Sequence, residues 1–204
     1  MAPTLPSWWL LFLLLLGVGA TAAARGSKKL TPPVSTAYEW PERFHAVVVS
    51  IDLTSHDRGG GRLQLIELYY DWPHGRDLNI VRDQLSGDPP LYNVEWVNGT
   101  SYLFDTAASS CRTFQFPVGL LPPDWIATAN YLGRDTVDGF ECHVWSNFLF
   151  SRYYADVATG HPVRWIFNGS TRHVLEFEAG VVLQDSSKWQ APPYCFASST
   201  PPPI

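Results

Sequence analysis

Residues 138–167 constrain the fold of this chain most, because apolar and polar residues alternate there between tight-turn signals. Asp138-Gly139 predicts a two-residue hairpin turn, since both residue types tolerate the positive φ that such a turn needs. In the strand after this turn, Phe140, Cys142 and Val144 alternate with polar and aromatic residues, so the two sets point to opposite faces of a sheet. A second turn is predicted at residues 158–161. The segment therefore predicts three antiparallel strands.

The rest of the chain continues this pattern. Short β-rich segments separated by Gly, Pro and Asn recur at a spacing of about 8–12 residues, which is typical of all-β domains. They cover residues 44–53, 63–72, 76–82, 91–97, 101–104, 111–116, 131–137 and 173–183. Pro122-Pro123-Asp124 favours a helix start, so residues 125–130 are predicted to form one or two helical turns. The predicted class is all-β, with a short helical segment or two.

The two ends of the chain predict processing and disorder. Residues 8–19 are an apolar run of signal-peptide length, too short to span a bilayer, and small residues precede Arg25. We expect a signal peptide over residues 1–24, a mobile leader over 25–37, a single domain over 38–196 and a disordered tail over 197–204. The mature protein is expected to be secreted without a stable membrane anchor, and its final compartment stays open.

Charge and cysteine content narrow the possible partners. The net charge of -5 argues against a nucleic-acid partner, because phosphate binding needs a basic face. Three cysteines allow one internal disulfide and one free or intermolecular thiol. Cys195 follows a Pro-Pro break, where a disulfide would hold the tail, and its partner is either Cys111 or Cys142. No cysteine or histidine spacing fits zinc, so we predict no metal and no cofactor.

Two sequons predict N-glycosylation in a secreted chain. Asn98-Gly99-Thr100 and Asn168-Gly169-Ser170 both lack proline at the middle position, and both lie at predicted turns. Sugars attached at Asn98 and Asn168 would project into solvent. The alternative is that each Asn-Gly pair serves the turn alone.

No catalytic signature identifies a reaction. The chain has neither a G-x-S-x-G elbow nor an H-E-x-x-H zinc pair, and its six histidines are dispersed. Glu176 and Glu178 share one face of a predicted strand, so they cannot flank a glycosidic bond. Glu141 and His143 are interpreted as part of a polar outer face, with a base–orienter pair as the alternative. The catalytic residues stay unknown.

Aromatic residues are the strongest indication of function. Nine tryptophans and 14% aromatic residues indicate either a large core or an aromatic surface that meets a ligand. The candidate ligand-binding residues are Tyr70, Trp72, Trp96, Trp145, Tyr154 and Trp165. They recur on neighbouring predicted strands, where a half-open sheet would hold an apolar molecule or stack on sugar rings. The alternative is that they fill an ordinary core.

Six motifs carry a family resemblance over residues 38–196: EWPERFHAVVVSIDL, LYYDWPHGRDLNIV, YNVEWVNGTSYLF, DTVDGFECHVW, YYADVATGHPVRW and SKWQAPPYCF. They resemble an uncharacterised family of secreted plant proteins that is often labelled as transferring glycosyl groups. The DGFEC turn with its aromatic hairpin is similar, more remotely, to the ependymin and bacterial lipoprotein-carrier group. That similarity implies a curved antiparallel sheet, a half-barrel, with an apolar pocket on its concave side.

Three functions are compatible with these patterns. The preferred one is a secreted glycoprotein that binds an apolar or lipid-like ligand. The alternatives are a glycosyl-group transferase or other carbohydrate-active enzyme, and an extracellular or cell-wall interaction protein. The expected partner is an apolar small molecule or a glycan, while ligand identity and oligomeric state stay open. A deep pocket with few polar groups favours the first function, opposed carboxylates favour the second, and a flat exposed aromatic patch favours the third.

Overall fold

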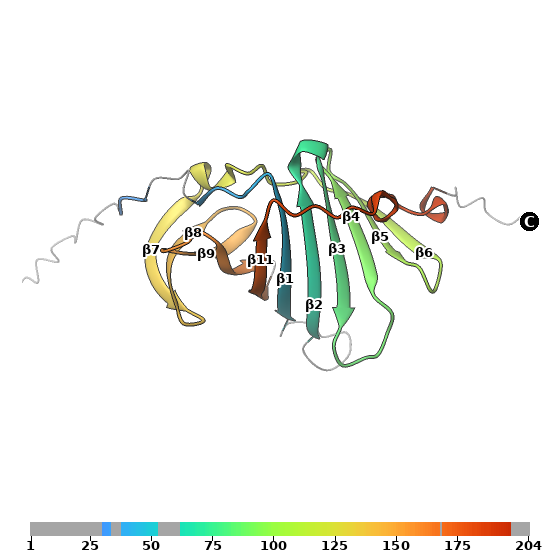
Figure 1. Ribbon diagram of the computed structural model, residues 1–204, viewed down its shortest axis with the longest axis horizontal. Helices are drawn as coiled ribbons and strands as arrows, with labels where there is room; N and C mark the ends of the chain where they lie inside the picture. The colour runs from blue at the N-terminus through green and yellow to red at the C-terminus, as the bar shows by residue number, and fades with distance from the viewer. Residues whose placement is uncertain (1–29, 34–37, 53–61, 168, 197–204) are drawn as a thin grey trace, which may run out of the picture.

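The strands of this protein form one open, curved antiparallel sheet (Figure 1). The computed structural model describes residues 30–33, 38–52, 62–167 and 169–196. Its 11 strands lie in the order β6-β5-β4-β3-β2-β1-β11-β10-β9-β8-β7. Their bounds are β1 (Arg43–Asp52), β2 (Arg62–Asp71), β3 (Arg76–Asp83), β4 (Leu91–Trp96), β5 (Thr100–Asp105), β6 (Ser110–Gln115), β7 (Asn130–Val137), β8 (Phe140–Ser146), β9 (Phe150–Asp156), β10 (Pro162–Phe167) and β11 (Ser170–Ala179). The predicted all-β half-barrel is confirmed.

Two meanders build this sheet and meet where β1 pairs with β11. Strands β1 to β6 follow one another, strands β7 to β11 do the same, and residues 116–129 lead the chain from one edge to the other. In the β1–β11 pair, Phe44 lies opposite Ala179, and a bulge interrupts the register between Val47 and Val48. The two halves of the sequence therefore share one continuous ladder.

Local turn chemistry explains where the strands end. Asp138 has φ of 52° and Gly139 has φ of 88°, which confirms the predicted hairpin between β7 and β8. The predicted helical segment is the 3-10 helix η3 (Trp125–Thr128). The sequence predicts a last strand that reaches residue 183, but β11 ends at Ala179, because Gly180 adopts φ of 79° and turns the chain out of the sheet.

The sheet separates two faces, which we define by β1. The inner face carries Phe44, Ala46 and Val48, and the outer face carries the alternate residues between them. On the outer face, the C-terminal residues 181–196 run across the first meander, drawn in red in Figure 1. They bury Trp189 against an outer cluster formed by Leu78, Ile80, Val94 and Phe104. The outer face of the first meander is thus closed by the chain itself.

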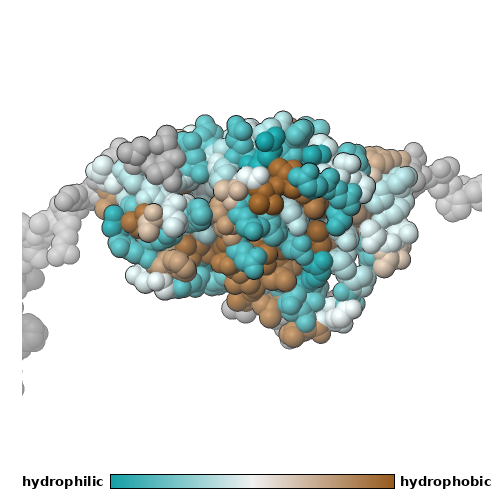
Figure 2. Space-filling view, in the orientation of Figure 1, coloured by the Kyte–Doolittle hydropathy of each residue, from teal (hydrophilic) through white to brown (hydrophobic). Residues whose placement is uncertain are grey.

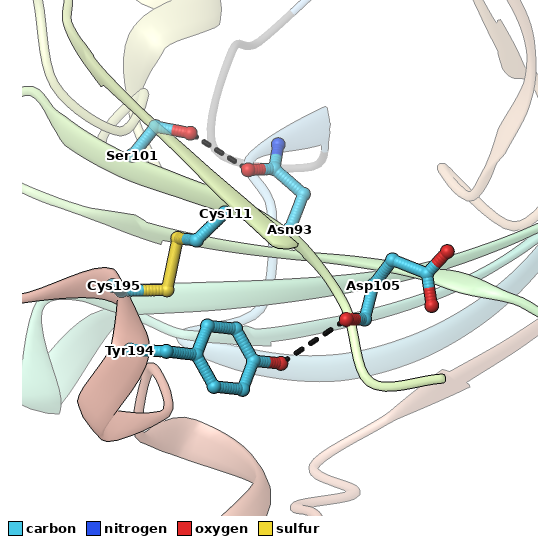
Figure 3. The surroundings of a disulfide bond; sticks show 6 residues. All are labelled: Asn93, Ser101, Asp105, Cys111, Tyr194 and Cys195. Atoms are coloured by element: carbon cyan, nitrogen blue, oxygen red, sulfur yellow. Dashed lines mark hydrogen bonds between the residues drawn. A yellow bond between two sulfur atoms is a disulfide. The ribbon is translucent and has the colours of Figure 1, made fainter. Parts of the chain in front are cut away.

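A disulfide attaches this C-terminal segment to the edge of the sheet (Figure 3). It joins Cys195 to Cys111 on β6, whereas Cys142 is a buried free thiol. Nearby, the Tyr194 hydroxyl donates a hydrogen bond of 3.2 Å to the carbonyl of Asp105. The structure therefore selects Cys111 from the two partners that the sequence left open.

Several sequence predictions lie outside the described residues. These are the signal peptide over 1–24, most of the leader over 25–37, the acceptor Asn168 and the tail over 197–204. The other acceptor, Asn98, is exposed, and its side-chain oxygen accepts a hydrogen bond of 3.0 Å from the Thr100 amide. Its use as a glycosylation site stays a prediction.

Candidate functional site on the inner face of the sheet

Aromatic side chains from both meanders meet on the inner face and form what we call the inner aromatic cluster. Its buried rings are Tyr38, Phe44, Tyr70, Trp125, Trp145, Phe150, Tyr153 and Trp165, and Trp40, Trp72, Tyr131, Phe167 and Phe177 pack against them. Tyr153 is fully buried at the centre, where its hydroxyl accepts a hydrogen bond of 2.8 Å from Trp40. The Trp125 ring meets Tyr153 edge-on at 4.8 Å between centroids. The cluster joins strands that are distant in the sheet order, because the sheet curves toward this face.

The six predicted ligand-binding residues are divided between the two faces. Tyr70, Trp145 and Trp165 belong to the inner aromatic cluster, and Trp72 packs against it. Trp96 packs against the outer cluster, and Tyr154 lies in a small separate core with Val144 and Val163. Strand parity is the reason, since neighbouring residues such as Tyr153 and Tyr154 point to opposite faces. The structure thus brings four of the six together, and their role toward a ligand stays a prediction.

Residues 116–129 cover the inner aromatic cluster, and we call them the cover segment. Its η3 helix inserts the buried side chains of Trp125 and Ile126. Its backbone is held from the sheet side, because Tyr70 donates its hydroxyl to the Leu121 carbonyl at 2.7 Å and the Trp40 amide donates to Pro123 at 3.0 Å. The cover segment therefore completes the inner aromatic cluster with buried apolar side chains.

A gap interrupts the sheet beside the C-terminal half of β11, where the pairing with β10 ends. The ladder between β10 and β11 runs from Phe167–Ser170 to Arg164–His173, so within the described chain residues 174–179 pair with β1 alone. Two cavities of 190 and 240 Å³ lie there, between β11 and the β9–β10 turn. Both border Phe177, whose ring contacts His161 at 4.9 Å. Phe177 packs on the inner aromatic cluster, so both cavities adjoin that cluster there, and the larger cavity also borders Val163 of the small separate core.

Polar residues on β3, β4 and β5 occupy another part of the inner face. Asp77 and Glu95 are directly paired across β3 and β4, so their side chains project from the same face. Asn93 donates to Glu95 at 2.5 Å and accepts a hydrogen bond of 2.7 Å from Ser101, as Figure 3 shows for the second contact. Together with Asn79 and with Arg172 of β11, they make up the inner polar cluster. This cluster includes the residues that the sequence analysis missed.

The charges of this cluster are poorly compensated. Burial raises the pKa of Asp77 well above its usual range, and the Glu95 carboxylate adds to that rise, while Arg172 opposes it. Burial also raises the pKa of Glu95, against the lowering effects of Arg172 and the Asn93 hydrogen bond. Burial lowers the pKa of Arg172 in turn. Like charges placed directly opposite one another destabilise a sheet, and perturbed pKa values concentrate at functional sites.

The sequence signal that could have revealed this cluster is an alternation of polar and apolar residues in β3 and β4. In β3, Asp77 and Asn79 alternate with apolar residues, and in β4 Asn93 and Glu95 do the same. Such alternation usually marks a solvent face. Here the apolar alternates face the C-terminal segment instead, so the polar set is left on the inner face. The position of these polar residues on the inner face follows only from the pairing register and from the course of residues 181–196.

His143 does not lie on a polar outer face, as the alternation in β8 suggests. Its ring is buried 5.0 Å from the ring of Tyr38 and makes a hydrogen bond of 2.7 Å with the Tyr131 hydroxyl. Burial and the charge of Arg134 lower the pKa of His143. The prediction was wrong because the N-terminal approach to β1 covers this face. Glu141 instead pairs with Arg134 at 2.7 Å in an exposed position.

Two further properties concern the described part of the chain. Among these residues, no group of three or more His, Cys, Asp or Glu side chains is arranged to hold a metal ion. In the same residues, no helix has the length and apolar character needed to cross a membrane.

Comparison with solved structures gives distant likenesses. An uncharacterized conserved protein from Thermus thermophilus is 13% identical, with a TM-score of 0.49, over 78% of this chain and 90% of that chain. A structure described as a putative outer membrane lipoprotein-sorting protein domain, from Vibrio parahaemolyticus, is 9% identical over 76% and 92%, with a TM-score of 0.41. A LolA superfamily protein from Nitrosomonas europaea is 7% identical over 73% and 91%, with a TM-score of 0.37.

These likenesses have TM-scores below 0.5, so we derive the function from the geometry of the site. None of the three descriptions mentions glycosyl transfer, and that part of the family resemblance stays a prediction. The comparison with curated proteins gives no match. One family model, described as "Domain of unknown function (DUF8395)", matches residues 39–195. The chain therefore belongs to the DUF8395 family.

Proposed function

We propose that the protein is a secreted module that binds an apolar or lipid-like small molecule at the inner face of its half-barrel. The observation that carries this proposal is the pair of cavities beside Phe177, which lie in a gap of the sheet and adjoin the inner aromatic cluster. Ligand sites are typically concave and mostly apolar, with a few polar groups that orient the ligand. The larger cavity combines an apolar wall with the polar groups of Asp156, His161 and Glu176, and the adjoining cluster is apolar.

The lining of the larger cavity supports an apolar ligand. Val163, Val174 and Phe177 form part of its wall, together with Phe140 and Leu175. The last two are 50% and 59% exposed, which is high for large apolar side chains in a folded domain. Figure 2 shows apolar residues gathered at the surface over the central strands. Covering such surface with a ligand gains about 25 cal/mol for each Å² removed from water.

The cover segment is the part that a larger ligand would displace. Trp125 and Ile126 fill the space above the inner aromatic cluster, and a ligand that displaced them would meet Tyr153 and Trp165. The described hydrogen bonds between this segment and the rest of the chain lie at Phe116, Leu121 and Pro123. We therefore expect small ligands to occupy the gap alone and longer ones to extend beneath the cover segment.

The two alternative functions have less support from the geometry. Asp77 and Glu95 project side by side from neighbouring strands, whereas glycosidic chemistry needs carboxyl groups on both sides of a bond. An interaction surface is favoured by one observation, the stacked rings of Phe114 and Phe116 at 6.0 Å near edge strand β6. That pair is small, so an interaction role is the second candidate.

Secretion is proposed on independent grounds. The disulfide between Cys111 and Cys195 is of a kind that persists in oxidising compartments. Residues 1–24 have the composition of a signal peptide, and Asn98 is an exposed sequon. A glycoprotein of the secretory route accounts for all three features.

Binding of a fluorescent fatty acid to the secreted chain tests the proposal. Leu175→Glu places a charge on the wall of the larger cavity and should weaken binding about tenfold or more, because the bound hydrocarbon chain would remove that charge from water without pairing it. Leu85→Glu is the matched control, since Leu85 is 87% exposed in a turn that does not line either cavity. Equal affinities of the two variants and the wild type would overturn the assignment of the gap.

A further inference from the structure

We propose that the ligand of the inner face carries a zwitterionic head group, whose amine contacts Asp77 and Glu95 and whose anionic group contacts Arg172. This inference rests on the proposed function, because it specifies the polar end of the same amphiphile. It concerns the inner polar cluster, which an ordinary apolar pocket does not need.

The register brings these three side chains to the same face from different parts of the sheet. Asp77 and Glu95 are cross-strand partners on β3 and β4. Arg172 lies opposite Ser50, whose side chain shares the inner face with Val48. Strands β1 and β2 separate Arg172 from the carboxyl pair, and the curvature of the sheet brings the charges within electrostatic range. The acidic and basic groups therefore share the inner surface of the sheet.

These opposite charges do not satisfy each other. Among the described residues, neither carboxyl group forms an ion pair with Arg172, and the buried Nε of Arg172 has no hydrogen-bond partner. The guanidinium instead lies 5.2 Å from the centre of the Phe167 ring. A buried Nε donor without a partner and a carboxyl pair placed side by side are two independent signs of a missing partner.

Asp71 is an example in this protein of a buried carboxylate whose charge is compensated by neighbouring side chains. Asp71 is fully buried, and its carboxylate oxygens lie 3.1 Å from a nitrogen of Arg43, 2.8 Å from a nitrogen of His74 and 3.0 Å from a nitrogen of Arg76. That site is complete within the chain. The inner polar cluster has the charges for a similar site, but no ion pair joins Arg172 to Asp77 or Glu95 among the described residues, so a group that carries both signs would compensate them together.

The chemistry of the two sides defines the ligand. Asn79 donates to Asp77 at 3.4 Å and Asn93 donates to Glu95 at 2.5 Å, which leaves further lone pairs on both carboxyl groups for the three donors of an ammonium group. A guanidinium forms its strongest hydrogen bonds with phosphate or carboxylate oxygens, through parallel donors. A head group with an ammonium near a phosphate or carboxylate satisfies both sides at once.

The cluster also adjoins the apolar site. Burial and, after it, the charge of Asp77 raise the pKa of Tyr70, a member of the inner aromatic cluster. The guanidinium of Arg172 lies over Phe167, which packs on the same cluster. A head group held there would place its hydrocarbon chain against aromatic rings. This juxtaposition favours an amphiphile over a free zwitterion.

Affinities for four single-chain amphiphiles of equal acyl length test the inference on the secreted chain by tryptophan fluorescence. Lysophosphatidylethanolamine has both charges, lysophosphatidylglycerol has only the phosphate, a fatty acid has only a carboxylate, and an alkylamine has only the amine. We expect lysophosphatidylethanolamine to bind about tenfold more tightly than lysophosphatidylglycerol, since charge-assisted hydrogen bonds distinguish them. Free phosphoethanolamine tests whether the head group binds without a chain.

Three variants test which residues contact the amine of the head group and which contact its anionic group. Glu95→Gln and Asp77→Asn should bring the affinity ratio between the two lysophospholipids close to one, with lysophosphatidylglycerol still bound. Arg172→Gln should weaken both lysophospholipids and leave the alkylamine unchanged. Glu178→Gln is the control, because Glu178 pairs with His45 on the outer face and should leave all affinities unchanged.

The possible outcomes separate the two proposals. Equal wild-type affinity for all four amphiphiles would overturn the zwitterionic head group and leave the apolar site standing. Binding of no amphiphile would overturn the proposed function itself. A preference for lysophosphatidylethanolamine that survives both carboxamide variants would show that other residues read the amine, and would overturn the role of Asp77 and Glu95.

Discussion

At the scale of single residues, two acidic positions on adjoining strands have opposite electrostatic environments. Burial alone would raise the pKa of Asp71, but hydrogen bonds from His74, Arg76 and Arg43 outweigh it and lower that pKa. Asp77 receives a 3.4 Å hydrogen bond from the Asn79 side chain and one from the Glu95 backbone, and burial raises its pKa against the lowering effect of the backbone bond. The Asp71 carboxylate therefore stabilises the ends of β1, β2 and β3. The Asp77 carboxylate lowers the stability of the fold when it is ionised.

The raised pKa values predict an unusual pH dependence. A carboxyl group whose folded-state pKa exceeds its unfolded value binds protons more tightly in the folded state, so stability falls as pH rises from about 4 through the folded pKa. Asp77 and Glu95 should both contribute to this fall, with Arg172 and Tyr70 as the titratable groups that face them. Glu95→Gln should flatten the decline and raise Tm at pH 7, by about 2–4 °C per kcal/mol of repulsion removed.

Thermal unfolding of the wild type and Glu95→Gln between pH 4 and pH 8 measures this. The control is Glu141→Gln, because Glu141 is exposed and pairs with Arg134 at the surface. A wild-type decline that Glu95→Gln leaves unchanged would contradict the electrostatic description of the cluster.

Asp71 predicts the opposite response to substitution. Asp71→Asn should destabilise the fold by about 3–5 kcal/mol, because it leaves Arg43 and Arg76 without their buried acceptor. The same contribution should be lost in the wild type as pH falls below about 4 and through the lowered folded pKa. Urea unfolding measures the change, and Asp88→Asn is the control at an exposed acid. An effect no larger than that of the control would refute the assignment.

At the scale of elements, two segments close the faces of the sheet by different means. The C-terminal segment is fixed on the outer face by buried Trp189, by the guanidinium of Arg76 at 4.2 Å from that ring, and by the disulfide of Cys195. The cover segment on the inner face has no covalent attachment among the described residues. We therefore expect the outer closure to be permanent and the inner closure to open.

The disulfide predicts a redox-dependent stability. Cys111 and Cys195 are 84 residues apart, and removing a native disulfide typically costs about 2–5 kcal/mol. Cys195→Ser should lower stability by that amount and abolish the effect of reductant on urea unfolding. Cys142→Ala is the comparison, because Cys142 is buried with its pKa raised to about 11 and should leave the reductant effect intact. Equal sensitivity of Cys195→Ser and wild type to reductant would contradict the pairing.

The cover segment predicts a variant that opens the inner face. A Cβ at Gly119 would lie 1.8 Å from the Val97 carbonyl oxygen, so Gly119→Ala must displace the segment. We expect the variant to expose tryptophan to acrylamide quenching and to bind the fluorescent fatty acid faster. Gly87→Ala is the control, because nothing lies within 4 Å of its Cβ and only its φ of 71° is strained. Quenching no greater than that of Gly87→Ala would show that the segment does not move.

At the scale of the whole molecule, the sequence predicted the elements better than their assembly. Turn residues such as Asp138-Gly139 and alternating segments are local signals, and they located most strands. The pairing of β1 with β11 has no local signal, because it joins opposite ends of the described domain. Without that pairing, neither the gap beside β11 nor the approach of Arg172 to Asp77 is predictable.

The candidate site shows the same limit at the level of faces. Tyr70, Trp145 and Trp165 belong to one cluster, but Trp96 and Tyr154 lie elsewhere, because parity alone cannot say which face of each strand is inner. Polar alternation such as that of β3 and β4 is typical of a solvent face, but Trp189 covers the opposite, apolar face of these strands. Tertiary contacts therefore decide the function of residues whose local pattern is clear.

Native mass spectrometry of the secreted chain, after removal of N-glycans and with organic extraction of bound material, tests the central claim most directly. The account predicts a stoichiometric lipid-like adduct on the wild type and on Leu85→Glu, and its loss on Leu175→Glu, whose side chain lines the larger cavity. A wild-type mass without adduct, together with no binding of added amphiphiles, would contradict a lipid-binding half-barrel.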